Sequence, residues 1–384
     1  MELEDDRYEG REHSKIKHDF LAAYLTEASF KVLQGAGAAK IFTYVDGFAG
    51  PWSVADEENC SDSSFDYAVR VLLQTKEALS KQGARAPQLR FLLCEKDPVA
   101  FERLSQYARK KSGLEIEVFK GCFEDNLESI RSRCAGFTFS FIDPKGWNLR
   151  SGDIGDYLAR TRGDFLLNFM EHPISRHSSY PGVEASFGRF LGDPQWASKI
   201  DASKDAAPRE IQILELLKQR MKNCGAAKFL PDFPILKAKA QRVQMRLVLG
   251  TQHIQGVEVF RTVQRKLEQE QVVIRNNVQS GPDWGHSLFP EEMRIEMELD
   301  GRGVSGRRSR NQAEQEALRL MAEQGKFRFD ALAVRVMERV PVRMTDMKDV
   351  VMRLREEGKL VFELPPRAKK PREETLISMS NSAL

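Results

Sequence analysis

Long apolar runs, paired cysteines and an excess of one charge are all missing from this sequence of 384 residues. No apolar stretch approaches the ~20 residues that a bilayer span requires. The N-terminus is acidic, which is the wrong chemistry for a secretory signal. The five cysteines form no Cys-x-x-Cys pair and sit mostly in apolar surroundings, which predicts reduced thiols in a cytoplasmic protein. A net charge of +3 indicates no class of partner, because local charge runs matter more.

Several motifs with specific chemistry are also missing. Neither a Gly-x-Gly-x-x-Gly nor a Gly-x-x-x-x-Gly-Lys-Ser/Thr sequence occurs, which disfavours dinucleotide and P-loop sites. Residue order alone supports no Ser-His-Asp or Cys-His arrangement. His172 and His177 match no standard metal-ligand spacing and Pro173 lies between them, so a loop role is favoured and no metal is expected.

What the sequence does contain is a regular alternation of short apolar strands with helices. Such alternation predicts an α/β fold with a parallel sheet, right-handed crossovers and helices on both faces. The sheet is expected to use the stretches 41–46, 89–95, 115–120, 137–143, 165–170 and 244–249.

The patterns predict five successive parts of the chain. From about residue 311, three short helices and a strand follow one another within about 55 residues, which is the winged-helix layout. The expected parts are an N-terminal helical segment at 1–40, the α/β domain at 41–275 with an inserted helical segment at about 175–240, a linker at 276–310, the winged-helix domain at 311–366, and a basic and polar tail, expected to be disordered, at 367–384.

Two stretches organise the first domain, namely Tyr44–Trp52 and Phe141–Trp147. In each, an apolar run ends in an aspartate, and small or loop-forming residues follow at once. This pattern is typical of a buried parallel strand that ends at the carboxyl edge of its sheet. Ligands bind at that edge in open α/β sheets.

The first stretch and two later acids form a candidate cofactor site. A turn with little bulk lets the backbone approach a ligand, and a carboxylate at the next strand tip can accept hydrogen bonds from ribose hydroxyls. The residues expected to bind the cofactor are Asp46, Gly47, Phe48, Ala49, Gly50, Glu95, Cys122 and Glu124. The alternative is that the acids merely cap helices. From these residues alone, the cofactor can be NAD, a nucleotide or S-adenosylmethionine.

The first turn resembles the opening motif, Asp-x-Phe-x-Gly, of class I S-adenosylmethionine-dependent methyltransferases. The stretch Asp143-Pro144-Lys145-Gly146-Trp147 is similar to their Asp-Pro-Pro-aromatic motif. That resemblance implies a catalytic site of Asp143, Pro144, Lys145 and Trp147, in which acid and carbonyl accept hydrogen bonds from an exocyclic amine and the indole stacks on a flipped base. Lys145 departs from the motif and favours a more acidic target, and Trp52 stands where a glycine is usual. The alternative is a simple turn in which Trp147 is packed.

The residue order over 11–275 resembles the three-Cys-motif partner protein family (TcmP), through His13-Ser14-x-x-Lys17, the two aspartate motifs and Thr251-x-His253-x-x-Gly256. This resemblance implies a Rossmann-like methyltransferase domain and a partner protein with a three-cysteine motif that resembles radical S-adenosylmethionine enzymes. Family members often have Gly-Ser-Pro where this chain has Asp62-Ser63-Ser64. His13 and Lys17 can also be read as a solvated helix face.

Basic residues lie around the expected winged helix, from Arg302 to Arg372, and can neutralise phosphates. Its third helix also carries acids, so a protein-contacting face is a second interpretation. The leading hypothesis is an S-adenosylmethionine-dependent methyltransferase, or a close relative, that acts on nucleic acid. Its rival is a non-catalytic regulatory partner whose Rossmann pocket is degenerate and which binds protein or DNA.

Overall fold

A computed structural model describes residues 8, 10–34, 40–51, 54–56, 58–83, 86–147, 149–171, 182–203, 207–280, 299–300 and 303–380. The chain divides into two compact units, 1–252 and 253–384.

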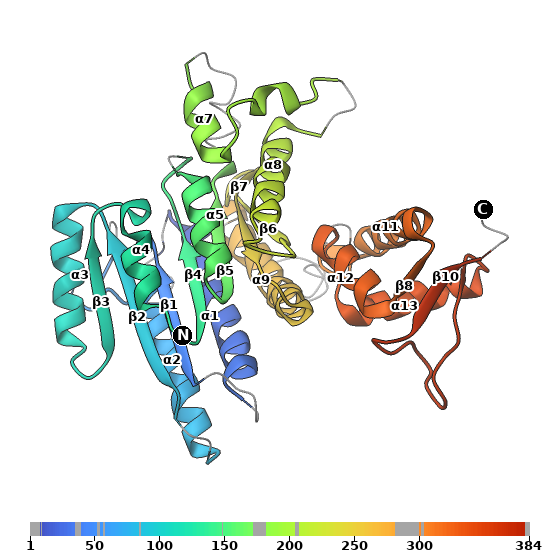
Figure 1. Ribbon diagram of the computed structural model, residues 1–384, viewed down its shortest axis with the longest axis horizontal. Helices are drawn as coiled ribbons and strands as arrows, with labels where there is room; N and C mark the ends of the chain where they lie inside the picture. Colours follow the sequence, from blue (N-terminus) through green and yellow to red (C-terminus); the bar gives the residue numbers. More distant parts are fainter. Residues whose placement is uncertain are drawn as a thin grey trace. The chain divides into compact units, whose positions relative to one another are not determined.

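The first unit contains a seven-stranded sheet with the order β3-β2-β1-β4-β5-β7-β6 (Figure 1). The first five strands of that order run parallel, whereas β7 is antiparallel to both β5 and β6. The strands are β1 (Ile41–Asp46), β2 (Gln88–Glu95), β3 (Glu115–Lys120), β4 (Phe137–Ile142), β5 (Gly163–Phe169), β6 (Asp232–Leu236) and β7 (Val243–Gly250). The predicted α/β class and mostly parallel sheet are confirmed, and the order is consistent with a Rossmann-like methyltransferase fold.

Helices cover the sheet on both faces (Figure 1). One layer holds α1 (Glu12–Leu33), α2 (Ser64–Lys81) and α3 (Pro98–Lys110), and the other α4 (Phe123–Arg133), α5 (Ser151–Arg160), α7 (Glu184–Leu191), the 3₁₀ helix η2 (Trp196–Lys199) and α8 (Arg209–Asn223). Side chains alternate between the faces of each strand. Val45 and Ile142 therefore face the second layer, and the next residues, Asp46 and Asp143, turn toward α1 and α2.

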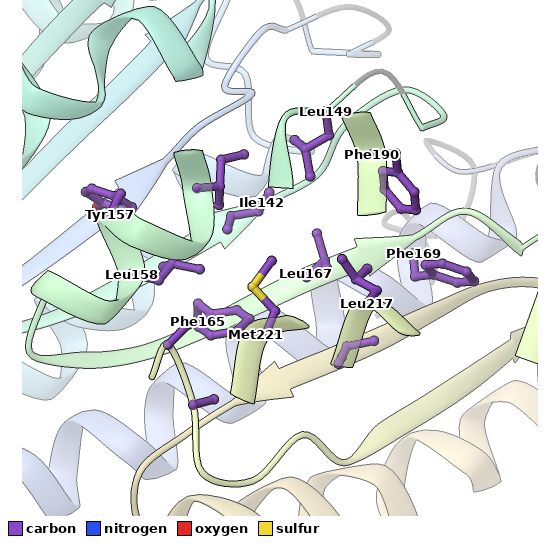
Figure 2. Packing of buried hydrophobic residues seen from close by; sticks show 14 of the residues in the cluster. Ile142, Leu149, Tyr157, Leu158, Phe165, Leu167, Phe169, Phe190, Leu217 and Met221 are labelled. Carbon is purple, nitrogen blue, oxygen red and sulfur yellow. The ribbon is translucent and has the colours of Figure 1, made fainter. Parts of the chain in front are cut away.

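The second layer is held by a continuous apolar core. Figure 2 shows Phe165, Leu167 and Phe169 of β5 beside Leu217 and Met221 of α8, all buried. Helices α5 and α8 approach each other closely because α5 has a glycine at position 155. A Cβ there would lie 2.9 Å from the Cys224 sulfur. This packing fixes β5 and, with it, the residues at its carboxyl end.

The segment interpreted as a helical insertion contains a strand that the sequence pattern did not predict. Strand β6 pairs with β7 at the edge of the sheet, and its residues alternate between buried and partly buried. Pro231 and Pro234 had suggested a break in the sheet. An edge strand tolerates Pro234 because one side of its backbone needs no ladder partner.

The second unit combines helices with a small antiparallel sheet of order β8-β10-β9. Its elements are α9 (Ile254–Ser280), α11 (Arg307–Gln324), β8 (Lys326–Arg328), α12 (Phe329–Arg339), α13 (Met344–Glu356), β9 (Leu360–Val361) and β10 (Leu376–Met379). Helix α9 belongs here because Arg261, which is buried, donates to the carbonyls of Met337 (2.8 Å) and Glu338 (3.1 Å) at the end of α12. The sequence pattern had placed this helix with the α/β domain.

The C-terminal tail is ordered as far as residue 380, contrary to the prediction from sequence. Residues 367–384 were expected to be disordered, yet β10 is the middle strand of the small sheet. Ile377 is fully buried there, and it explains why a polar stretch is ordered: one apolar side chain fills the core between two paired strands. None of the described helices has both the length and the apolar character needed to cross a membrane.

Candidate functional site at the carboxyl edge of the sheet

The strand order changes direction between β1 and β4. Strands β2 and β3 continue on one side of β1, and β4 and β5 continue on the other. Such a topological switch point opens a crevice for ligands at the carboxyl ends of the strands. Asp46 ends β1, and Asp143 follows β4 directly. The structure thus places both predicted aspartates at the point where a ligand site is expected.

Asp46 is fully buried and accepts three hydrogen bonds. One carboxylate oxygen accepts from the Phe48 amide (3.0 Å), and the other from the hydroxyls of Ser64 (2.7 Å) and Tyr44 (3.2 Å). Burial raises the pKa of Asp46, the hydrogen bonds from Ser64 and Phe48 lower it, and the nearby Asp143 raises it, so that the pKa is about 6. The two aspartates are therefore close enough to interact electrostatically.

The turn after β1 leaves no space for a side chain at its first position. The Gly47 amide donates to the Phe141 carbonyl (3.0 Å), and the Ala49 amide donates to the Cys94 carbonyl (2.9 Å). A Cβ on Gly47 would lie 2.8 Å from the ring of Phe123, which is buried at the start of α4. Glycine is required here by close packing, and the turn is tied to the ends of β2 and β4.

We expect Gly47→Ala to lower the free energy of unfolding by roughly 1–3 kcal/mol, because the buried Phe123 ring would have to shift to admit the new methyl group. Urea denaturation measures this change. Gly152→Ala is the matched control: its Cβ would meet only the Arg220 side chain at 3.6 Å, and alanine favours the α5 helix. Equal stability of the two variants would contradict the close packing at Gly47.

Glu95 lies at the tip of β2, beside the turn, and is nearly fully buried. One of its oxygens accepts from the Asp97 amide (2.6 Å). Burial raises the pKa of Glu95, and the positive charge of Lys145 opposes that rise. Burial also raises the pKa of the neighbouring Cys94 thiol to about 12, assisted by the charges of Glu95 and Asp46. The carboxylates at the ends of β1 and β2, Asp46 and Glu95, thus lie close enough for both to act on the Cys94 thiol.

The remaining predicted cofactor residues lie just beyond β3. Cys122 is exposed at the N-cap of α4, and Glu124 stands in the first turn of that helix. A Glu124 oxygen accepts from the Arg150 amide (3.2 Å). The helix-capping role considered for Glu95 belongs instead to Asp97, whose carboxylate accepts from the Val99 and Ala100 amides at the start of α3.

Asp143 is held from two sides. Lys17 of α1 donates to one carboxylate oxygen (2.5 Å), and Asn168 of β5 donates to the other (2.6 Å). Lys17 is only 8% exposed, so the interpretation of this position as a solvated helix face is wrong. His13 lies one helical turn earlier; burial lowers its pKa, and Lys17 lowers it further. The N-terminal helix is therefore part of the site.

Trp147 lies against α7. Its indole stacks on Phe187, with the ring centroids 5.0 Å apart and an angle of 16°, and its N–H donates to the Ser186 hydroxyl (3.1 Å). This is the packed arrangement that stood as the alternative to base stacking. Pro144 is buried and Lys145 is exposed. Trp52, His172, His177 and Arg302 lie outside the described residues.

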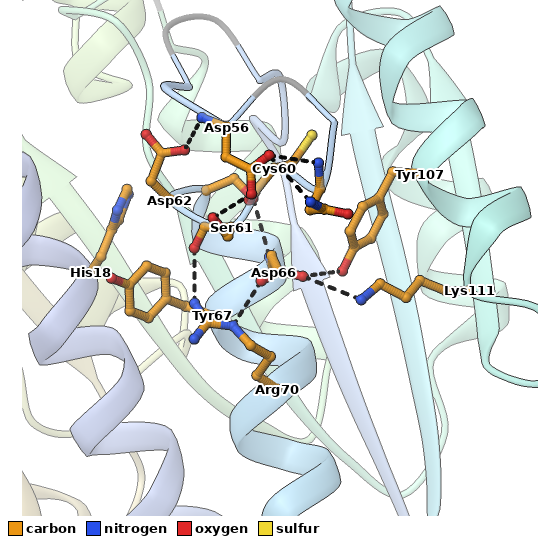
Figure 3. Close-up of polar contacts among 12 residues, drawn as sticks. His18, Asp56, Cys60, Ser61, Asp62, Asp66, Tyr67, Arg70, Tyr107 and Lys111 are labelled. Atoms are coloured by element: carbon orange, nitrogen blue, oxygen red, sulfur yellow. Dashed lines mark hydrogen bonds and ion pairs between the residues drawn. The ribbon is translucent and has the colours of Figure 1, made fainter. Parts of the chain in front are cut away.

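The loop that leads into α2 is anchored by a polar cluster (Figure 3). Asp62 accepts from Arg11 (3.1 Å) and from the Ala55 amide (2.9 Å). Asp66 accepts from Tyr107 (2.8 Å) and Arg70 (2.7 Å). This anchoring gives the Asp62-Ser63-Ser64 stretch a role: it presents the Ser64 hydroxyl to Asp46.

His18 packs against the same cluster (Figure 3). Its ring nitrogen lies 2.9 Å from the Tyr8 hydroxyl. Burial lowers the pKa of His18 well below its usual value, so the ring is neutral at physiological pH. Within the described ranges, no group of three or more His, Cys, Asp or Glu side chains is arranged to hold a metal ion.

Comparison with known proteins gives only distant likenesses. No protein-family model and no curated protein matches the chain. Among solved structures, protein LPL1258 from Legionella pneumophila is 10% identical, with a TM-score of 0.36 over 71% of this chain and 93% of that one. The O-methyltransferase TomG from Streptomyces achromogenes, solved with S-adenosylmethionine, is 10% identical, with a TM-score of 0.30 over 60% and 79%. These likenesses are too weak to indicate a function. A functional interpretation therefore depends on the strand order and the geometry of the site.

Proposed function

We propose that the first unit binds S-adenosylmethionine and transfers its methyl group to an acceptor held near Asp143. The observation that carries this proposal is the gathering of Asp46, Glu95 and Asp143 at the switch point of the sheet, around a turn in which a Cβ on Gly47 would clash. Methyltransferase motifs in the sequence occupy these same strand ends. The chemistry of the residues fits the cofactor, since buried carboxylates suit hydroxyl and ammonium groups.

Each residue has a distinct task in this proposal. Glu95 accepts hydrogen bonds from the ribose hydroxyls, because a carboxylate offers about four lone-pair sites and the Asp97 amide uses one. Asp46 holds the turn through the Phe48 amide and places negative charge beside the cationic end of the cofactor. Asp143 orients the acceptor.

S-adenosylmethionine supplies an already reactive methyl group on a sulfonium. The acceptor would take the methyl carbon and release a proton to solvent or to a nearby base, and the cofactor would leave as a neutral thioether. The protein contributes mainly by holding donor and acceptor in line, which is a large effect in bimolecular reactions.

The proposal is tested by calorimetric titration of the full chain with S-adenosylmethionine. We expect binding that Glu95→Gln weakens by about 10- to 100-fold, the cost of losing hydrogen bonds to a charged acceptor. Glu102→Gln, on the exposed side of α3, is the control and should bind like the wild type. A chain that binds no S-adenosylmethionine would instead support a regulatory partner with a degenerate pocket.

For the second unit we propose a winged-helix module that contacts nucleic acid. The order of α11, β8, α12, α13, β9 and β10 supports this module, with its three-stranded antiparallel sheet. A polar hollow at the start of α11 supports phosphate contact and is lined by Asp300, Arg307, Arg308, Asn311, Gln312 and Gln315. On the third helix, α13, Arg353 is instead paired with Glu314 (2.9 Å) and Glu357 (3.1 Å).

A nucleic-acid substrate and a three-cysteine partner protein complete the proposal, the latter on the sequence resemblance alone. Arg308→Ala should weaken the binding of duplex DNA and make it less dependent on salt, because one phosphate contact is lost. A fluorescence titration at several salt concentrations measures both effects. If the dependence of DNA affinity on salt concentration does not change, a protein-contacting surface would be the better interpretation of this unit.

A further inference from the structure

A buried hydroxyl without a partner lies at the start of α5. Ser151 is the first residue of this helix and is fully buried, yet its oxygen Oγ forms no hydrogen bond with any described residue. Buried polar atoms without partners are rare, and each one requires an explanation. This hydroxyl is available to a group that the protein itself does not supply.

The backbone at the same end of the helix is also unpaired. The amides of Ser151, Gly152 and Asp153 have no hydrogen-bond partner among the described residues, and Arg150, at the N-cap position, provides no side-chain cap. The first amide of the helix that is bonded belongs to Ile154, which donates to the Arg150 carbonyl (3.2 Å). Unpaired amides at a helix N-terminus, together with the helix dipole, favour the binding of an anion.

Arg220 of α8 places a cation at this end of α5. Its Nη2 atom lies 3.6 Å from the position that a Cβ on Gly152 would take, and its Nε atom lies 3.2 Å from that of a Cβ on Gly192. The Ser151 Oγ lies 3.4 Å from the same Gly192 position. Among the described residues, no carboxylate pairs with Arg220, and its buried Nε has no hydrogen-bond partner. The guanidinium and the hydroxyl therefore border one small space, and neither is satisfied by the protein.

Two glycines keep this space open. Apart from α5 itself, Arg220 Nη2 is the only atom of the described residues within 4 Å of a Cβ at Gly152, so a ligand can approach the backbone there. Gly152 is partly exposed, and its backbone does not have the positive φ that would require glycine. A Cβ at Gly192 would fill the space between Arg220 Nε and Ser151 Oγ, although its φ of 64° already favours glycine at the end of α7. Close approach of a ligand explains Gly152, which the helix alone does not.

The donors around this space fit a tetrahedral oxyanion. A planar carboxylate has two oxygens, and a guanidinium alone can satisfy both of them. A phosphate group presents three strongly accepting oxygens, which match three sources of donors, namely the guanidinium, the hydroxyl and the helix amides. The acids nearest to the helix end are occupied, since Asp125 and Asp153 pair with Arg150 at 2.8 and 3.0 Å. They leave Arg220 to a ligand.

We propose that the start of α5 and Arg220 form a binding site for a phosphate group, with the Ser151 hydroxyl, the Gly152 and Asp153 amides and the Arg220 guanidinium as its donors. The phosphate belongs to a small phosphorylated molecule or to the backbone of a nucleic acid, since both present the same oxygens. Residues 144–150 connect this site to Asp143 at the end of β4. The inference does not depend on the proposed methyl transfer, because phosphate binding is measured without the cofactor.

Phosphorus NMR of inorganic phosphate, titrated with the full chain at constant ionic strength, measures the binding. We expect saturable binding that Arg220→Gln weakens by about tenfold or more, because charge-assisted hydrogen bonds are lost. Arg160→Gln removes the same charge at the exposed far end of α5 and should bind phosphate like the wild type.

Ser151→Ala separates a ligand-binding role from a structural one. It should weaken phosphate binding by about threefold or more, because one hydrogen bond to a charged group is lost. Its free energy of unfolding without phosphate should be unchanged or higher, because the wild-type hydroxyl is buried without a hydrogen bond. Urea denaturation measures this second quantity, and a clear loss of stability with unchanged phosphate binding would mean that Ser151 serves the fold.

Competition with inorganic phosphate identifies the source of the phosphate group. Displacement by ribose phosphate but not by ribose supports a small phosphorylated ligand, and displacement by a single-stranded oligonucleotide alone supports a nucleic-acid backbone. Two results overturn the inference: no saturable phosphate binding by the wild type, or equal binding by Arg220→Gln and Arg160→Gln. The first of these needs no variant, so the inference stays testable even if Arg220→Gln fails to fold.

Discussion

Asp232→Leu is expected to lower the free energy of unfolding by about 3 kcal/mol, because it removes the carboxylate that the buried Lys218 and the partly buried Arg246 share. Asp232, on β6, accepts from Lys218 (2.7 Å) and from Arg246 (2.8 Å), and Arg246 also pairs with Glu171 beyond the end of β5. These ion pairs connect α8 to the edge strand β6, and they connect β6 and β7 to the end of β5. Chemical denaturation at pH 7 measures the loss.

The pH dependence of stability gives this prediction a second readout. Burial alone would raise the pKa of Asp232, but Lys218 and Arg246 lower it below the ordinary value of 3.8. A carboxyl with a lowered pKa contributes stability above its unfolded pKa, and this contribution is lost as the pH falls through the folded one. The wild type should therefore lose stability below about pH 4, and Asp232→Leu should lose less there. Glu77→Gln, at an exposed position of α2, serves as control. A variant that follows the wild-type pH curve would contradict the assignment.

The strands and the acids at their ends could be predicted because both depend on local chemistry. An apolar run that stops at a carboxylate and continues into loop-forming residues marks the end of a buried strand. Asp46, Glu95 and Asp143 were identified in this way. Strand order follows from βαβ connections, so their meeting at one sheet edge could be expected as well.

Contacts between distant segments could not be read in the same way. Lys17 pairs with a residue 126 positions later, and the helical spacing around it fits a solvated face equally well. Trp147 stacks on Phe187 of α7, a helix within a segment whose prolines obscured its pattern. Ile377 is buried although its surroundings are polar, because pairing with β8 and β9 outweighs local composition.

Asp46→Asn is expected to change stability in the direction opposite to that of Asp232→Leu. Among the described residues, no cation offsets the burial of Asp46, and its pKa rises from 3.8 to about 6. A carboxyl with a raised pKa contributes stability below its unfolded pKa and loses this contribution as the pH rises through the folded one. A pKa raised from 3.8 to about 6 means that the buried, ionised carboxylate costs ~3 kcal/mol of folding stability above pH 6. The neutral amide avoids that cost but loses part of the hydrogen bonding to Tyr44, Ser64 and Phe48, so a net gain of roughly 1–2 kcal/mol is expected at pH 8.

The same substitution should weaken the binding of S-adenosylmethionine, because the charge beside the cationic end of the cofactor is gone. A site that gains stability and loses affinity on one isosteric change is retained for function rather than for folding. Denaturation at pH 5 and pH 8, together with calorimetric titration, tests both halves of this prediction. Asp125→Asn, exposed on α4, should change neither quantity. Equal destabilisation of Asp46→Asn at both pH values would mean that Asp46 serves the fold through its hydrogen bonds, and the charge at the end of β1 would then need another explanation.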